Sequence, residues 1–331
     1  MDRLIRRAAG VGVLAVTATA CASAPRALPL PVATPVPAVT RSPAAPPRPT
    51  PPRLGPPFAV GIRTVTIVDP TRSTPARGPS GAHPARTLTT TVWYPIAGTV
   101  PLRRAFPLVV FAHGFDVTPD TYRLLLADIA ADGYVVAAPL FPISGAGLPG
   151  PAREDDLPNQ PADLSVVITA MLDAGRPGGW LAGAVNPALI GVVGHSDGAE
   201  TVAAMLVVPA DRDRRVSAYV VLAGQLPTWG TVAPFPTAVL VEQGRADTIN
   251  PPWLSRSLFA ALLRPKDYLD VLYGSHLEPV VGSSADAVAV RQTVIAFLDA
   301  ALRPSPTAGL ALRRWGDDPG VTLLTELPAT G

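Results

Sequence analysis

The chain has 331 residues, of which 48% are hydrophobic and 16% are charged. That length fits one large domain or two ordinary ones, with enough apolar side chains for a sizeable core. The formal net charge of +2 excludes a strongly basic surface of the kind that attracts nucleic acid or an anionic membrane.

Residues 1–21 have the pattern of an export signal. Arginines in the first seven residues precede an apolar stretch at 8–18, which is too short to span a bilayer. Small residues then lead to Cys21, the only cysteine. This resembles the lipobox of bacterial lipoproteins, in which the cysteine is lipidated, although Ala18 stands where Leu is usual. The alternative is an ordinary secretory signal with Cys21 incidental, so the protein is expected to be anchored to the cell envelope at Cys21 or secreted.

Residues 22–57 are predicted to be a linker. Thirteen of the 33 residues at 25–57 are Pro, and they show no apolar periodicity. Such a composition cannot bury a core and favours extended, polyproline-like conformations. The segment is either a stalk that holds the following domain away from a surface or a dispensable leader.

Residues 58–302 are predicted to form one α/β domain. Stretches 60–68 and 86–93 are rich in β-branched residues and predict two antiparallel strands. Short apolar runs then alternate with helical stretches, which predicts a mostly parallel sheet covered by helices on both faces. Further strands are expected at 107–112, 134–138, 189–194, 216–223, 237–243 and 268–273. Helices are expected at 119–133, from 159 or 161 to about 173, and at 198–208, 251–263 and 285–302. No insertion is long enough for a separate lid domain.

Residues 303–331 are predicted to be a C-terminal tail. They are punctuated by Pro and Gly and contain Trp315 and a short apolar run at 321–324. The segment is expected either to pack as a final strand or to trail from the domain.

The most informative motif is GHSDG at residues 194–198. It fits G-x-S-x-G and lies between an expected strand and an expected helix, which is the context of a nucleophile elbow. Glycines beside the serine avoid clashes in a strained turn, and a helix N-terminus favours developing negative charge. We therefore predict that Ser196 is a nucleophile.

Three segments resemble the α/β-hydrolase family, namely VWYP at 92–95, FAHGF at 111–115 and the GHSDG motif. The pattern is similar to bacterial esterases related to dienelactone hydrolases, platelet-activating-factor acetylhydrolases and cutinase-like polyester hydrolases, and it covers residues 58–302. This resemblance implies hydrolysis of a carboxylic ester through an acyl-serine intermediate. It also implies the chain order serine, acid, histidine for the catalytic residues.

A serine hydroxyl needs an adjacent base, and the chain offers four histidines. His83 precedes the parallel sheet, His113 lies where the oxyanion pocket is built, and His195 points away from the adjacent Ser196. Only His276, after the last expected strand of the parallel sheet, satisfies the family's chain order. We therefore predict that His276 is the base.

The acid that orients this imidazole is predicted to be Asp247, in the turn after the strand at 237–243. Glu242, the nearest competitor, belongs to the strand itself. Asp267 and Asp270 flank the last expected strand too closely to reach back.

The oxyanion hole is expected from the backbone N–H groups of Asp197 and Phe115. Gly114 or Asp116 could supply the second donor in place of Phe115. The Phe115 side chain is also expected to form one wall of the substrate site.

Two further residues bear on the substrate. Trp229 lies on the loop after the sixth expected strand, where related enzymes place an aromatic that flanks the acyl group; the alternative is a loop hydrophobe packed on the surface. Asp197 stands where polyester-cleaving relatives commonly carry Met, and a carboxylate there argues against a polymer. The expected partner is thus a small to medium ester or lipid, with membrane contact only through the N-terminal anchor.

No metal or cofactor is predicted. The histidines are scattered, and no clustered ligand set or Gly-rich phosphate loop is present. The acidic run at 154–156 could hold Ca²⁺, but such a run is more often solvated. The alternatives to an esterase are a serine peptidase, amidase or acyltransferase on the same triad, and a non-catalytic cell-envelope lipoprotein.

Overall fold

The computed structural model describes residues 57–328. Cys21, the rest of the predicted signal and the linker through residue 56 lie outside the described residues. Within the described part of the chain, no helix is both long and apolar enough to cross a membrane.

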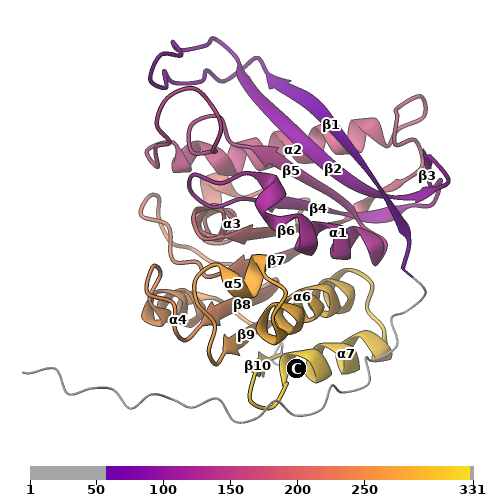
Figure 1. Cartoon of the computed structure of the whole chain (residues 1–331), viewed down its shortest axis with the longest axis vertical. Coiled ribbons are helices and arrows are strands. Elements are labelled where there is room, and N and C mark those ends of the chain that lie inside the picture. Colours follow the sequence, from indigo (N-terminus) through magenta and orange to yellow (C-terminus); the bar gives the residue numbers. More distant parts are fainter. Residues whose placement is uncertain (1–56, 329–331) are drawn as a thin grey trace, which may run out of the picture. The chain divides into compact units, whose positions relative to one another are not determined.

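The described residues are organised around one mixed sheet with the strand order β1-β2-β5-β4-β6-β7-β8-β9-β10, with β3 paired to β2 (Figure 1). The strands from β5 to β9 run parallel, whereas β1, β2 and β10 are antiparallel to their neighbours. The strands are β1 (Ala59–Asp69), β2 (Arg86–Ala97), β3 (Val100–Pro101), β4 (Phe106–Ala112), β5 (Val135–Leu140), β6 (Val185–His195), β7 (Ala218–Leu222), β8 (Ala238–Gly244), β9 (Lys266–Val271) and β10 (Thr322–Leu327).

Helices cover both faces of this sheet, as predicted. The core on one face is formed with α2 (Gln160–Ala174), α3 (Asp197–Val207) and α4 (Pro252–Ala261). The core on the other face is formed with α1 (Arg123–Ala131), α5 (Glu278–Val281), α6 (Ala285–Leu302) and α7 (Pro306–Gly316).

The central strand β4 shows why its sequence is apolar without interruption. Leu108 and Val110 belong to the core on one face, whereas Val109 and Phe111 belong to the core on the other. Successive side chains of a strand point to opposite faces, so a strand covered on both sides needs apolar residues at every position.

The segment after residue 302, predicted as a C-terminal tail, forms a helix and a strand that pack on the domain. Helix α7 packs through Leu312, and strand β10 packs through Leu324, against the same core as α6. Strand β10 pairs antiparallel with β9, from Thr322 opposite Val271 to Leu327 opposite Lys266. The predicted domain boundary at 302 was therefore too early, and the final-strand alternative describes this segment.

Candidate active site

Ser196 lies on a strained turn between β6 and α3. Its backbone has φ 56° and ψ −123°, a conformation that L-residues rarely adopt. A Cβ on Gly194 would lie 2.1 Å from the Gly198 carbonyl oxygen, and one on Gly198 would lie 2.1 Å from the Ala112 carbonyl oxygen. Because backbone atoms cannot give way, both positions require glycine. The turn therefore presents the Ser196 hydroxyl at the N-terminus of α3.

The structure brings Ser196, His276 and Asp247 together in one hydrogen-bonded chain. His276 Nε2 lies 2.9 Å from Ser196 Oγ, and His276 Nδ1 lies 2.8 Å from Asp247 Oδ2. These residues follow β6, β9 and β8, whose carboxyl ends lie at the same edge of the parallel sheet. Segments far apart in the sequence thus meet because of the sheet topology.

Asp247 is held in place by its own hydrogen bonds. The Ile249 and Asn250 N–H groups each donate to Oδ1 at 2.9 Å, and Gln243 Nε2 donates to Oδ2 at 3.0 Å. The residue is 4% exposed. A carboxylate that accepts several donors is fixed in orientation, so Asp247 can hold the imidazole of His276 in one orientation.

The N–H groups available for an oxyanion hole can be identified from the hydrogen bonds of the loop after β4. The Gly114 N–H donates to Tyr122 Oη at 3.1 Å, and the Asp116 N–H donates to the Ser144 carbonyl at 2.9 Å. Within residues 57–328, the N–H groups of Phe115 and Asp197 donate to no group. Of the three candidates for the second donor, Phe115 is therefore the one that is free. The loop lies against the nucleophile, because a Cβ on Gly114 would be 3.1 Å from Ser196 Cβ.

His113 holds the loop after β4 in place through two hydrogen bonds. Its Nδ1 lies 2.7 Å from the Gly114 carbonyl, and its Nε2 accepts a hydrogen bond from the Phe141 N–H at 3.0 Å. Burial lowers the pKa of His113 to about 4, so the imidazole is neutral with its proton on Nδ1. His113 is thus a structural support of the oxyanion loop.

Asp197 places a carboxyl group beside the nucleophile. Its Oδ2 is enclosed and has no hydrogen-bond partner among the described residues. Burial, together with the nearby charges of Glu154 and Glu200, raises the pKa of Asp197 to about 7. This wall of the site is therefore close to half-ionised at neutral pH.

The acidic run at 154–156 is divided among three different environments. Glu154 interacts with Asp197, Asp155 pairs with Arg153 at 3.0 Å, and Asp156 is buried against Arg86. Within the described part of the chain, no group of three or more His, Cys, Asp or Glu side chains could hold a metal ion.

Trp229 is not brought together with the nucleophile. Its indole Nε1 donates to Asp211 Oδ2 at 2.9 Å, and the ring packs against the core beside α3. Asp211 lies beyond the C-terminus of α3, an 11-residue helix, whereas Ser196 lies at its N-terminus. That length corresponds to roughly 16 Å. The geometry fits the alternative of a packed loop hydrophobe, whereas Phe115 lies next to the nucleophile with a 38% exposed side chain.

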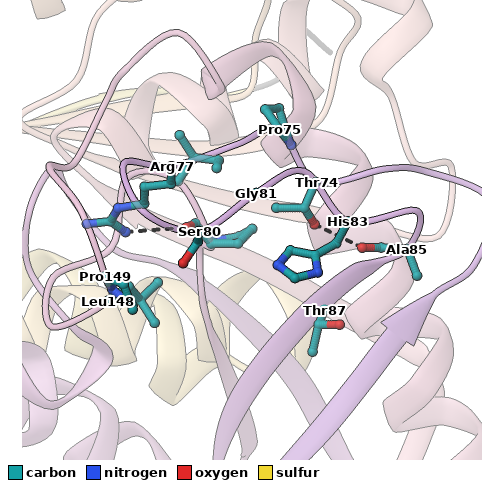
Figure 2. Close-up of a pocket in the computed structure, with 12 residues that line it drawn as sticks. Thr74, Pro75, Arg77, Ser80, Gly81, His83, Ala85, Thr87, Leu148 and Pro149 are labelled. Carbon is teal, nitrogen blue, oxygen red and sulfur yellow. Dashed lines mark hydrogen bonds between the residues drawn. The ribbon is translucent and has the colours of Figure 1, made fainter.

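One cavity of the described residues lies apart from these three side chains (Figure 2). It has a volume of about 310 Å³ and lies between the β1–β2 connection, which contributes His83, and the loop after β5, which contributes Leu148 and Pro149. None of Ser196, Asp247 and His276 lines it. His83 therefore belongs to a separate hollow of the surface.

Comparisons with known proteins bear on the fold that carries this site. Residues 89–230 match the model of the chlorophyllase family. A ferulic acid esterase from Streptomyces cinnamoneus superposes with a TM-score of 0.62 and 24% identity, over 82% of this chain and 96% of that chain. This chain has the α/β-hydrolase fold. No curated protein matches the sequence.

The α/β-hydrolase fold predicted from the sequence is thus confirmed. The chlorophyllase match and the structural similarity also support the prediction of a serine ester hydrolase. Sequence reasoning missed Tyr122, because no motif marks a tyrosine whose hydroxyl reaches the oxyanion loop only in the folded chain.

Proposed function

We propose that this α/β-hydrolase cleaves carboxylic esters, with Ser196 as nucleophile, His276 as general base and acid, and Asp247 as the residue that orients His276. The observation that carries the proposal is the unbroken chain of hydrogen bonds, 2.9 Å and 2.8 Å long, that ends at the strained Ser196. Nucleophile, base and orienting acid are each in hydrogen-bonding distance.

In the acylation step, Ser196 Oγ attacks the ester carbonyl carbon while His276 Nε2 takes the hydroxyl proton. The positive charge that forms on the imidazole is stabilised by Asp247, to which Nδ1–H donates. As the tetrahedral intermediate collapses, the bond to the alcohol oxygen breaks. His276 returns the proton to that oxygen. The alcohol then departs, and Ser196 remains acylated.

In the deacylation step, a water molecule takes the place of the alcohol. His276 removes one proton from the water, whose oxygen attacks the acyl carbon, and then protonates Ser196 Oγ as the acid departs. One ester and one water thus give one acid and one alcohol.

In both steps the carbonyl oxygen gains negative charge, which the free N–H groups of Phe115 and Asp197 would stabilise. The N-terminus of α3 adds its partial positive charge at the same point.

We propose a small to medium ester or a lipid as substrate, and a lipid anchor at Cys21 that holds the exported enzyme at the cell envelope. The carboxyl group of Asp197 beside Ser196 makes the site less suited to a wholly apolar polymer substrate. The anchor rests on the sequence pattern of residues 1–21.

The test is hydrolysis of p-nitrophenyl esters of increasing acyl length, a ferulate ester and a matched p-nitroanilide by the wild type and by Ser196→Ala. The wild type is expected to release p-nitrophenol at least about 1000-fold faster than the variant. His276→Ala and Asp247→Asn are also expected to release p-nitrophenol far more slowly than the wild type.

The other outcomes decide between the alternatives. Cleavage of the anilide but not of the esters would identify a peptidase or amidase, and acyl transfer to an added alcohol in preference to water would identify an acyltransferase. Ester turnover no faster than that of Ser196→Ala by a folded chain would refute the esterase.

A further inference from the structure

Two buried side chains lie directly behind the nucleophile and form no part of the proposed proton transfer. Tyr122 ends the 3₁₀ turn Pro119–Tyr122 that leads into α1, and it is 0% exposed. His195 is the last residue of β6, precedes Ser196 and is 1% exposed. Their rings lie 5.5 Å apart.

Hydrogen bonds join these side chains to both catalytic loops. The Gly114 N–H donates to Tyr122 Oη at 3.1 Å, and Tyr122 Oη lies 2.9 Å from His195 Nδ1. At the other end, His195 Nε2 lies 2.8 Å from the carbonyl oxygen of His276. The oxyanion loop and the base loop are thus connected through two side chains beneath Ser196.

The donors and acceptors of this chain can be assigned. A carbonyl oxygen only accepts, so His195 Nε2 carries a proton. Burial lowers the pKa of His195 to about 4, so the ring is neutral and its Nδ1 must accept the hydroxyl proton of Tyr122. Every polar atom of the two side chains then has its partner, and one tautomer of His195 is fixed.

We propose that Tyr122 and His195 are positioning residues of the esterase site. They hold the Phe115 N–H and the His276 imidazole at the correct distance and orientation relative to Ser196. The inference rests on the proposed function, because the benefit of this positioning is ester hydrolysis. The hydrogen-bonded link from Gly114 to His276 is independent of any substrate. Gly114 precedes the free N–H of Phe115, and the carbonyl that His195 holds belongs to the base itself.

The neutrality of His195 is part of this arrangement. Its ring centroid lies 4.8 Å from that of His276, which becomes positively charged when it takes the Ser196 proton. A neutral neighbour places no like charge next to that imidazolium, while its N–H still holds the backbone of the base.

The first test compares Tyr122→Phe with Tyr134→Phe in the full-length chain. Both tyrosines are 0% exposed, but Tyr134 Oη donates to Asp299 at 2.6 Å and precedes the amino end of β5, at the sheet edge opposite the catalytic loops. Tyr122→Phe is expected to lower kcat about 10- to 100-fold with KM changed less than threefold, because displaced catalytic groups bind substrate but react slowly. Tyr134→Phe is expected to lower the Tm with kcat within about twofold of wild type.

A second measurement does not depend on the substrate. The proton between His276 Nδ1 and Asp247 is expected to give a downfield NMR signal, which Tyr122→Phe shifts or broadens and Tyr134→Phe leaves unchanged. If the wild type hydrolysed no ester but this signal still responded to Tyr122→Phe alone, the proposed function would fail and the positioning role would stand.

His195 provides the check in case Tyr122→Phe does not fold. His195→Gln keeps an N–H that can reach the His276 carbonyl, whereas His195→Leu does not, so Gln is expected to retain at least about fivefold more kcat than Leu. The proposal is overturned if Tyr122→Phe and Tyr134→Phe have the same kcat and the same downfield signal, or if Gln and Leu at position 195 have equal kcat.

Discussion

Asp197 combines two opposed electrostatic effects in one residue. Its backbone N–H is free at the N-terminus of α3 and is placed to stabilise an oxyanion. Its side chain, however, acquires a negative charge as the pH rises through its pKa of about 7. In the proposed mechanism the same residue therefore assists the reaction through its backbone and opposes it through its carboxylate.

The first prediction concerns the pH dependence that this carboxylate causes. Below pH 7 the neutral Asp197 leaves the developing oxyanion undisturbed, and above pH 7 its charge raises the energy of that oxyanion. The kcat/KM of the wild type is therefore expected to fall on the order of tenfold between about pH 7 and pH 9. In Asp197→Asn this alkaline decline should be absent when p-nitrophenyl ester hydrolysis is measured over the same range.

Asp155→Asn is the matched control, because Asp155 is an exposed acid paired with Arg153 and is not among the charges that raise the pKa of Asp197. It should keep the wild-type profile. An unchanged alkaline decline in Asp197→Asn would exclude the charge of Asp197 as its cause.

The proposed catalytic residues were predictable to the extent that their signals are local. The position of Ser196 follows from the glycines around it and from the change of strand to helix, and His276 and Asp247 follow from the family's chain order. The link from Tyr122 to His195 has no such signal, because it joins residues 73 positions apart only after β4 and β6 have paired. The environment of Trp229 could not be predicted either, because its hydrogen bond to Asp211 forms only in the folded chain.

At the scale of elements, the last helix and strand complete the sheet. Strand β10 covers the edge of β9, which would otherwise present unpaired N–H and C=O groups to other chains. Helix α7 has a buried and an exposed apolar side chain close together: Leu312 is 4% exposed, whereas Leu310 is 63% exposed.

The second prediction uses this pair of leucines. If α7 is docked as described, Leu312→Ala should lower the free energy of unfolding by about 2–3 kcal/mol, since it leaves a cavity in the core. Leu310→Ala on the same helix should change it by less than about 0.5 kcal/mol. Urea denaturation of both variants measures the difference, and equal effects would show that α7 is not packed on the domain.

Helix and strand positions were predictable where the sequence period was clear. The expected helix at 285–302 has the bounds of α6, and the expected strand at 107–112 begins one residue inside β4. Strand β10 was left undecided because its apolar run is short and its exposed positions alternate with buried ones. Such a pattern becomes a strand only when a partner such as β9 is available.

At the scale of the whole molecule, the described domain follows a leader with its own predicted role. The third prediction is that Cys21 is acylated when the full chain is expressed in a bacterial host. The wild type should incorporate a labelled fatty acid and sediment with membranes, whereas Cys21→Ser should do neither. A wild-type chain that is exported without the label would contradict the anchor and support an ordinary secretory signal.

The sheet also explains why one domain suffices for the site. Three loops from the carboxyl ends of β6, β8 and β9 bring Ser196, Asp247 and His276 together, and the loop after β4 presents the free N–H of Phe115. We propose that these groups together form an acyl-enzyme on Ser196.

The most direct measurement is peptide mapping by mass spectrometry after the full chain has been mixed with a p-nitrophenyl ester and quenched in acid. We expect the acyl group on Ser196 in the wild type, its accumulation in a variant slowed in deacylation, and no acylated peptide in Ser196→Ala. Rapid ester turnover with Ser196 unmodified throughout, or undiminished turnover by Ser196→Ala, would contradict this proposal.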